Sequence, residues 1–570
     1  MRELKVVGAK SFSESELIQA MGANPPSRWR LFKKELGWTR TELDEGVANL
    51  VRYLNRRGYF EASAVVASLK DGTAVVHVSE GPASYIYSLT VNGADRLKPG
   101  LRMKLGDLKL PLRKGEVFTV EAYEGTRRLL ERWMKDHGYP FAKTEPDAVV
   151  DMKDHRVVVS YELKPGEFAV FGEVVLKGVP ESEKITLKRA MTFSIGAPYN
   201  QSEVNRSVTR MYELGAFTSA TLSPVKTGTP GAVRMVGTLQ VGKVHRIKAG
   251  IGYGSVEEVR ATLGWETSLF RKRLMTLGFQ TRDSAIETRF SGEVRVPYFW
   301  TGDNTLLGGL TANRRVEQNF VYKAVKANFG MEHRFSDTLK GSISGVLERV
   351  LQVTPDQILE EALARGTTET ATMASTVFSL TWDTTDHPLD PTRGSILSAD
   401  VEPTLVLGDG TRFDRLILQG RHYWPLPRGF VFATKLKVGA ILTSAPTERI
   451  PVTRRFYAGG PNSIRGYRYD HLGPLSPTGV LIGGEGLVES SVELRFPIRG
   501  KLSGLLFTDA GNAYRKGFSF KGAKTMVGSG FGLRYMSPVG PVGADFAWKV
   551  RKDPTDPSPF LFYLFVGYAF

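Results

Sequence analysis

The chain has 570 residues, of which 41% are hydrophobic and 24% are charged, and it contains no cysteine. This length exceeds what a single hydrophobic core serves, so several domains are expected, and the composition excludes wholesale disorder. The absence of cysteine excludes disulfides, thiolate zinc sites and cysteine nucleophiles, and it suits a location in the cell envelope.

The formal net charge is +17, and a large positive charge is common in proteins that bind nucleic acid. Lys and Arg are nevertheless scattered along the chain, and no zinc-finger or RNA-recognition signature is present. Anionic lipid headgroups provide an equally good counter-charge. We therefore expect no nucleic-acid partner.

Neither a helical membrane span nor a secretory signal is evident. No run of about 18 apolar residues occurs, and Met1–Lys5 leads directly into a strand-like segment without an apolar core region. The chain is thus either cytosolic or a mature form, and its C-terminal half favours the mature form. These observations do not exclude a β-barrel that spans the membrane, since its strands need only about 10 residues each.

Two markers repeat within the first 244 residues. One is a glycine at the end of a short apolar strand, spaced about 85 residues apart, in Val7-Gly8-Ala9, Val91-Asn92-Gly93-Ala94 and Leu176-Lys177-Gly178-Val179. The other follows a helical segment, spaced about 80 residues apart, in Gly58-Tyr59-Phe60, Gly138-Tyr139-Pro140-Phe141 and Gly215-Ala216-Phe217. Two markers that keep step indicate three copies of one unit.

Each copy has the pattern of a small α+β domain. In the first, apolar residues between Leu43 and Leu54 follow helical spacing, and a strand over 74–78 comes next. The other copies repeat the plan around helices that contain Tyr123 and Val204. We predict units at residues 1–82, 83–165 and 166–244.

From residue 245 onward the sequence changes to short alternating segments. In Val259–Glu266, apolar and polar residues alternate without error, and about 16 such segments occur between Arg246 and Phe570. The last one alternates from Phe560 to the terminal aromatic Phe570, which is a hazard in water but suits a lipid-facing strand. The sequence predicts a 16-stranded antiparallel transmembrane β-barrel over 245–570.

Two connections stand out between these segments. Asp386–Gly394 is expected to form a short turn. After Val353, a capping pattern that begins at Thr354 and a glycine stop at Gly366 predict one short helix in an outer loop.

A third connection carries glycines and aromatics together: Arg455-Phe456-Tyr457-Ala458-Gly459-Gly460-Pro461-Asn462-Ser463-Ile464-Arg465-Gly466-Tyr467-Arg468-Tyr469. Its aromatic side chains need an apolar surface, so we expect the loop, at about 450–484, to fold back into a cavity. The core around Arg465-Gly466-Tyr467 resembles the inward-folded loop of the BamA/TamA superfamily of outer-membrane assembly factors, of the bacterial surface antigen type. The flanking wording, with Leu472-Gly473-Pro474, is most similar to the TamA branch.

The resemblance extends over nearly the whole chain. The three N-terminal units resemble POTRA domains, which in this superfamily lie in the periplasm of Gram-negative bacteria. It implies α+β N-terminal repeats (three POTRA domains) followed by the barrel, set in outer-membrane lipid. It also implies assembly or translocation of envelope proteins, with unfolded outer-membrane or autotransporter clients and a TamB-like, inner-membrane-anchored partner that spans the periplasm. The POTRA domains either bind partner and client along a sheet edge or act as spacers.

The resemblance also names an anchor for the loop. In the family the loop arginine meets acids from two barrel strands, which implies Arg465, with Gly466 and Tyr467, beside Glu493 and Asp509. Alternation around Glu493 points it into the lumen, whereas the alternation around Asp509 is too weak to orient it. The alternative is a set of lumen charges that never meet.

The seam between the first and last barrel strands is the expected lateral gate. Gly250, Gly252 and Gly254 add no side-chain packing, and Gly567, Tyr568 and Phe570 lie on the strand opposite. Unpaired backbone is costly in lipid, and a client strand that pairs with the open edge removes that cost. The alternative is a fully zipped seam.

No active site is recognised. Gly250–Gly254 lacks the Lys-Ser/Thr of a phosphate-binding loop, and the eight histidines show no metal-ligand spacing. We expect no enzyme and no cofactor. A BamA-like insertase and a two-partner secretion transporter remain alternatives within the superfamily, and a passive channel or an outer-membrane enzyme remain alternatives outside it.

Overall fold

The computed structural model describes residues 3–22, 38–70, 73–317, 320–355, 370–477, 479–519, 524–537, 540–553 and 556–566. The chain forms two compact units. One comprises residues 1–175, 192–207 and 221–237, and the other comprises 176–191, 208–220 and 238–570. No helix among the described residues is both long and apolar enough to cross a membrane.

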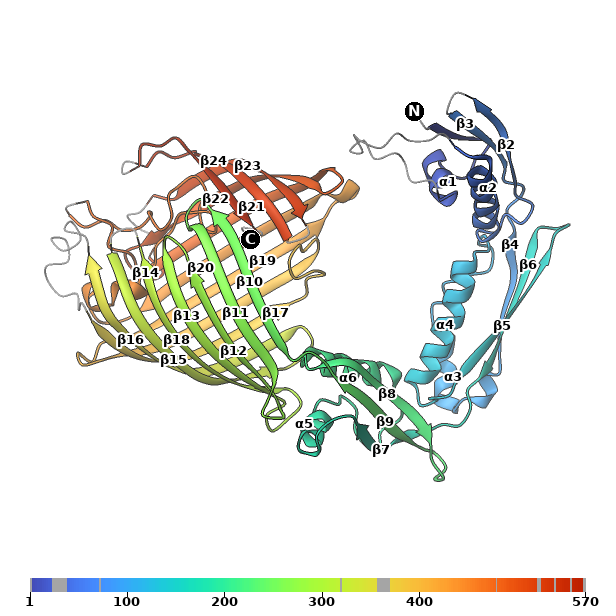
Figure 1. Cartoon of the computed structure of the whole chain (residues 1–570), viewed down its shortest axis with the longest axis horizontal. Coiled ribbons are helices and arrows are strands. Elements are labelled where there is room, and N and C mark those ends of the chain that lie inside the picture. Colours follow the sequence, from blue (N-terminus) through green and yellow to red (C-terminus); the bar gives the residue numbers. More distant parts are fainter. Residues whose placement is uncertain are drawn as a thin grey trace. The chain divides into compact units, whose positions relative to one another are not determined.

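Three small sheets of three strands each occupy the N-terminal part, in the orders β1-β3-β2, β4-β6-β5 and β7-β9-β8 (Figure 1). The first copy contains β1 (Glu3–Val7), α1 (Glu14–Ala20), α2 (Arg40–Asn55), β2 (Ser63–Lys70) and β3 (Thr73–Ser79). The second contains β4 (Tyr85–Asn92), α3 (Pro99–Gly106), α4 (Val120–Asp136), β5 (Lys143–Asp151) and β6 (Arg156–Lys164). The third contains β7 (Val170–Lys177), α5 (Lys184–Arg189), α6 (Gln201–Glu213), β8 (Phe217–Lys226) and β9 (Ala232–Val241). The predicted α+β repeats are confirmed.

The repeated glycine after the first strand of each copy has one physical cause. Gly8, Gly93 and Gly178 all have positive φ, at 104°, 79° and 83°. A Cβ at these positions would lie 2.3, 2.5 and 1.9 Å from a carbonyl oxygen of the central strand, on Val78, Leu163 and Leu239 respectively. Both the backbone angle and the close approach therefore require glycine.

The helices of each copy pack on one face of its sheet. Thr39 and Glu42 form a reciprocal capping box that starts α2, and Leu43, Leu50 and Leu54 of that helix are buried. In the second copy, Leu130 and Met134 of α4 enter the core that is formed with strand β6. The 3.6-residue apolar spacing of the sequence thus corresponds to the buried face of each helix.

The remaining 16 strands form one antiparallel sheet in sequence order. They are β10 (His245–Gly254), β11 (Glu258–Phe270), β12 (Arg273–Asp283), β13 (Glu287–Pro297), β14 (Asn304–Val316), β15 (Phe320–Arg334), β16 (Leu339–Pro355), β17 (Ala371–Asp383), β18 (Gly394–Leu407), β19 (Arg412–Pro425), β20 (Val431–Leu442), β21 (Gly486–Arg499), β22 (Leu502–Tyr514), β23 (Met526–Ser537), β24 (Gly540–Lys549) and β25 (Phe560–Val566). The predicted strand number is confirmed.

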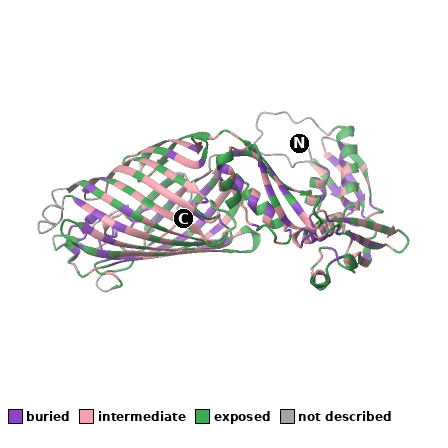
Figure 2. Ribbon diagram, turned by 90° about the horizontal axis from the view of Figure 1, so that it is seen from below, coloured by how far each residue is buried: buried purple, intermediate pink, exposed green. Residues whose placement is uncertain are grey.

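Exposed and less exposed residues alternate in bands along the barrel strands (Figure 2). On β21, for example, Val492 is exposed while its neighbours Ser491 and Glu493 are buried. Large apolar side chains such as Phe279, Leu310 and Phe329 are exposed on the outer face. This alternation is the pattern of a barrel that faces lipid outside and polar groups inside.

The three connections singled out in the sequence compare with expectation as follows. Thr354, expected to cap an outer-loop helix, lies instead in β16, and most of the predicted helix falls in 356–369, outside the described residues. The connection from Asp383 to Gly394 is a turn, as expected, closed by the backbone hydrogen bond from Thr384 to Ser395, and in it the Asp386 carboxylate accepts from the backbone and hydroxyl of Thr392. The long loop between β20 and β21 covers 443–485, so it begins earlier than predicted.

The end of α6 contacts a connection of the barrel within the larger unit. Arg210 forms an ion pair of 2.8 Å with Asp303, in the connection between β13 and β14. Tyr298 of the same connection donates its hydroxyl to the carbonyl of Arg210 at 2.8 Å. This contact joins the third small domain to the barrel end from which β10 begins.

Candidate functional site

The loop 443–485 is held at its base by a buried arginine. Arg455 is 4% exposed, and its guanidinium donates to the carbonyls of Ile450, Ile482 and Glu448 at 3.0, 2.9 and 3.2 Å. An arginine has five N–H donors, so one side chain can fix two stretches of loop backbone. Both ends of the loop are thereby closed against each other.

Apolar side chains of the loop build the core inside the barrel. Phe456, Ile464 and Tyr467 are buried together with inward-facing side chains of the barrel wall. The wall side chains are Ala324, Val350, Ala371, Met373, Val406, Phe413, Ile441, Leu487, Ala513 and Met526. The aromatic loop therefore has the apolar surface that the sequence demanded.

Arg465 lies at the centre of a buried cluster of charges and is 2% exposed. Its Nε and Nη2 donate to the two oxygens of Asp509 at 2.7 and 2.9 Å, and its backbone N–H donates to the same carboxylate at 3.0 Å. Its Nη1 lies 2.9 Å from Glu493 Oε1. The structure thus brings together Arg465, Glu493 and Asp509.

A third acid, Asp545 on β24, completes the cluster. Its Oδ2 lies 3.3 Å from Arg465 Nη1, and it also accepts two hydrogen bonds from Arg534 on β23, at 2.6 and 3.1 Å. Arg495 pairs with Glu493 at 3.1 Å. Three carboxylates therefore meet three guanidinium groups, which limits the cost of burying each charge.

Neither Asp545 nor Arg534 was recognised from the sequence. A signal was present, because Val542, Ala544, Phe546 and Trp548 are apolar at alternate positions, so the residue before Phe546 takes the opposite face. The structure confirms this orientation, since Val542 and Phe546 are exposed on the outer face. The same reasoning applies to Arg534 between the exposed Leu533 and Tyr535.

Gly466 and Tyr467 attach the loop to the last strands. Tyr563 on β25 accepts from the backbone N–H of Gly466 at 3.1 Å and donates to the carbonyl of Tyr467 at 2.9 Å. The Tyr467 hydroxyl reaches the carbonyls of Val527 and Arg551 at 3.0 and 2.6 Å. Side chain and backbone of these loop residues are therefore bound to the C-terminal part of the wall.

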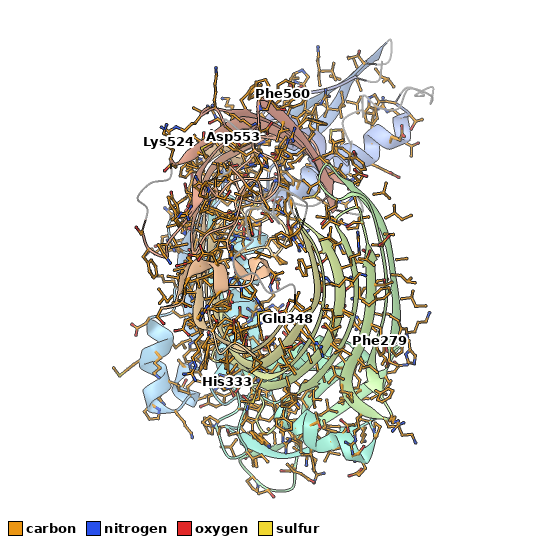
Figure 3. All side chains as sticks on the ribbon, turned by 90° about the vertical axis from the view of Figure 1, so that its left-hand side faces the viewer. Phe279, His333, Glu348, Lys524, Asp553 and Phe560 are labelled. Carbon is orange, nitrogen blue, oxygen red and sulfur yellow. The ribbon has the colours of Figure 1, made fainter. Side chains whose placement is uncertain are left out.

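The same loop also reaches the opposite wall. Arg454 pairs with Glu348 on β16 and, at 3.2 Å, with Glu402 on β18, and Tyr469 contacts Arg315 on β14. Figure 3 shows Glu348 on the inner side of the ring of strands. The loop is therefore a bridge across the lumen.

The first and last barrel strands meet at a seam that is paired differently from the other strands. β10 pairs with β11 from His245 to Gly254, whereas β10 and β25 share no ladder in the part of the chain that the structure describes. The strands are adjacent, since the Ser255 N–H donates to the Leu564 carbonyl at 3.3 Å. Gly250 has open space around its Cβ position. Of the predicted gate residues, Gly567, Tyr568 and Phe570 lie outside the described residues.

No group of three or more His, Cys, Asp or Glu side chains arranged to hold a metal ion occurs among the described residues. The acids around Arg465 are engaged by arginines instead. The chemistry of the cluster is therefore that of charge pairing, which fixes geometry.

The comparisons with known proteins agree with this architecture. A family model described as the Omp85 superfamily domain matches residues 241–570. The chain is 23% identical over 575 residues to outer membrane protein assembly factor BamA of Nitratidesulfovibrio vulgaris, over 95% of this chain and 69% of that protein. It is 21% identical over 622 residues to BamA of Neisseria meningitidis, over 97% of this chain and 76% of that protein.

Among solved structures, BamA from Haemophilus ducreyi lacking POTRA domains 1–3 has a similar fold. The TM-score is 0.65 at 18% identity, over 85% of this chain and 99% of that chain. Barrel, loop and small sheets thus define an outer-membrane protein with periplasmic POTRA domains. The chain belongs to the Omp85 superfamily. Its predicted closeness to the TamA branch stays a prediction.

Proposed function

We propose that this chain is an assembly factor that inserts or translocates envelope proteins at the outer membrane through its barrel seam. The observation that carries the proposal is the seam itself, where β10 and β25 lie side by side without a shared ladder in the described residues. Backbone groups that lack partners in lipid cost several kcal/mol each. A client strand that pairs with either edge removes that cost, so the seam acts as a lateral gate.

The lumen loop holds one of the two seam strands, β25, in place. Tyr563 of β25 is hydrogen-bonded to Gly466 and Tyr467 of the loop. The same loop forms ion pairs with β16 and β18, so these bonds connect the last strand to the opposite wall. β10 ends in the glycines Gly250, Gly252 and Gly254, which add no side-chain packing. We infer that β10 is the edge that moves and β25 the edge that stays.

The POTRA domains bind partner and client in this proposal. In each of the three sheets the middle strand is the last in sequence, so β1, β2, β4, β5, β7 and β8 are edges. An extended chain adds to such an edge through main-chain hydrogen bonds. The number of POTRA domains, three, and the sequence of the loop favour a TamA-like role with a TamB-like partner.

The alternatives are weighed on the same observations. A BamA-like insertase or a two-partner secretion transporter would use the same seam, and the clients distinguish them. A passive channel is disfavoured because the loop crosses the lumen and packs a buried apolar core against the inner wall. An outer-membrane enzyme is disfavoured because the buried acids are paired with arginines.

Reconstitution tests the proposal. Purified chain in liposomes is mixed with a urea-unfolded outer-membrane barrel or autotransporter, and client folding is followed by its shift on unheated gels. We expect faster folding than in empty liposomes and in liposomes that contain the barrel without residues 1–165. A client folding rate equal to that in empty liposomes, for both client types, contradicts the proposal.

A further inference from the structure

Three exposed basic residues lie side by side on the barrel wall. Arg314 on β14 is directly opposite Lys323 on β15, and Arg349 on β16 is opposite Val325, two residues from Lys323. All three are exposed. We call Arg314, Lys323 and Arg349 the cation row.

The cation row faces outward, because the residues beside it face inward. Arg315 contacts Tyr469 of the lumen loop, Glu348 pairs with Arg454, and Ala324 is buried in the lumen core. Successive strand residues point to opposite faces of a sheet. Arg314, Lys323 and Arg349 therefore point away from the lumen, toward the membrane.

The cation row stands at the end of the barrel that faces the cell exterior. β10 enters the barrel from the periplasmic POTRA domains, so odd-numbered connections along the sheet, such as the one after Val316, are extracellular. Arg314 lies two residues before that end, and Lys323 lies three residues after the start of β15. The row is thus at the level of the outer leaflet.

An apolar groove of about 850 Å³ runs along the same face toward the cation row. Its walls are large side chains, and its floor includes small residues such as Gly292, Gly308 and Ala312. The groove reaches Ala312 and Val325, each two residues from a basic residue on the same strand face. Walls are formed by Ile247, Leu263, Trp265, Phe279, Phe290 and Leu310.

The charges of the row need an anion that the described chain does not supply. Like charges directly opposite on neighbouring strands are destabilising. Among the described residues, no ion pair involves any of the three, and Asp283, two strands from Arg314, accepts from Thr288 at 2.6 Å. A phosphate bound between the side chains would offset the repulsion.

We propose that this face is a binding site for a phosphorylated lipid of the outer leaflet. Its phosphate groups contact Arg314, Lys323 and Arg349, and its acyl chains lie in the groove on the outer face of β10 to β15. Charge and shape both select this occupant, since a basic rim above an apolar groove complements an anionic head with hydrocarbon chains. The site goes beyond the assembly function and does not depend on it.

Native mass spectrometry of the 570-residue chain in detergent tests the site. The two lipids compared are lipid A, which is anionic through its phosphates, and phosphatidylcholine, which is zwitterionic. Near an anionic surface each basic residue contributes about 1 kcal/mol, or about a factor of five. The triple variant R314Q/K323Q/R349Q is therefore expected to bind lipid A about 100-fold more weakly. The matched variant K104Q/R128Q/R132Q removes three exposed charges from the second POTRA domain and should bind as the unaltered protein does.

Two further arms separate the groove from the charges. Gly308→Leu fills the groove, where a Cβ meets only Val294 at 3.7 Å, and should weaken binding of lipid A without changing charge. Excess inorganic phosphate should displace little lipid, because it lacks acyl chains. Equal lipid A binding by the R314Q/K323Q/R349Q and K104Q/R128Q/R132Q variants overturns the proposal. Full displacement by inorganic phosphate, with no effect of Gly308→Leu, also overturns it, because the site would then bind a free anion.

Discussion

Tyr563 on the last barrel strand accepts a hydrogen bond from the backbone N–H of Gly466 in the lumen loop, 3.1 Å away. The same hydroxyl donates to Tyr467, so one side chain of the seam strand closes on two successive loop residues. The state of the loop and the position of β25 are therefore physically linked.

Tyr563→Phe is expected to loosen the loop from β25. It leaves the Gly466 N–H without its partner, which costs about 1–3 kcal/mol for a buried group. Hydrogen exchange of residues 457–469 should become faster by a corresponding factor. Tyr535→Phe is the control, since that ring is 52% exposed on the outer face. Equal exchange rates of residues 457–469 in the two variants would show that the Tyr563 hydrogen bonds do not stabilise the loop.

Arg465→Ala should open the loop without unfolding the barrel. It leaves Asp509 and Glu493 without their shared cation, and breaking such a buried pair costs about 3–5 kcal/mol. Added protease should then cut between Tyr457 and Tyr469. The matched control is Arg468→Ala, because the Arg468 side chain is 54% exposed and Asp556, its partner at 3.5 Å, keeps an ion pair of 2.6 Å with Lys549.

The coupling within the cluster is tested by adding the acid substitutions. Glu493→Gln with Asp509→Asn should expose the loop as Arg465→Ala does, and the triple change should add little, because residues of one network are not additive. Arg465→Lys should not restore protection, since an ammonium cannot replace the bidentate contact with Asp509. Strictly additive effects would mean that the three residues do not form one site.

The contact between the third small domain and the barrel should be measurable as a coupling energy. A double-mutant cycle with Arg210→Ala and Asp303→Ala is expected to give about 1 kcal/mol, read from exchange protection of α5 and α6. Arg210 and Asp303 are 11% and 41% exposed, whereas Arg334 and Glu213 of the neighbouring pair are 29% and 46% exposed. The second pair is the control and should couple more weakly. A cycle that gives zero for both would remove any role for this contact.

The stability of the turn between β17 and β18 should depend on pH. Hydrogen bonds from the Thr392 hydroxyl, and then from the Thr392 and Arg393 backbone, lower the pKa of Asp386 to about 2. Because the folded pKa is below the ordinary value of about 3.9, the stabilisation is complete above that value and is lost as the pH falls toward 2. Exchange of the Thr392 amide should therefore be constant, after correction for intrinsic rates, from neutral pH to about 5. It should rise only below about 4, and Asp386→Asn should abolish the transition. A transition near neutral pH would contradict this assignment.

Most of the fold could be predicted because its signals are local. Helical spacing around Leu50, alternation around Val492 and the repeated glycines each reflect contacts within one small unit or one strand. Glu493 was oriented correctly by the same alternation. Asp545 lies on the inward face by the same alternation, but its pairing with Arg465 joins residues distant in the chain and has no local signal. The pairing of Arg454 with Glu348 and Glu402 had no sequence signal, since it joins a loop to strands distant in the chain.

The seam was the least accessible feature. Period-two alternation tells which face a side chain takes, but it is silent on which backbone groups of β10 and β25 are paired. The glycines of β10 indicated weak packing, and only the arrangement of strands places Ser255 beside Leu564.

A reversible disulfide across the seam tests whether the seam must open for client assembly. The chain has no cysteine, so Tyr253→Cys or Ser255→Cys is combined with Leu564→Cys, and the register that oxidises is selected. The control pair places cysteines on β10 and β11 at Ile251 and Ala261, which are already paired. We expect oxidation of the seam pair to stop client assembly in liposomes, reduction to restore it, and the control pair to have no effect. Undiminished assembly with the seam fully cross-linked would contradict the lateral gate.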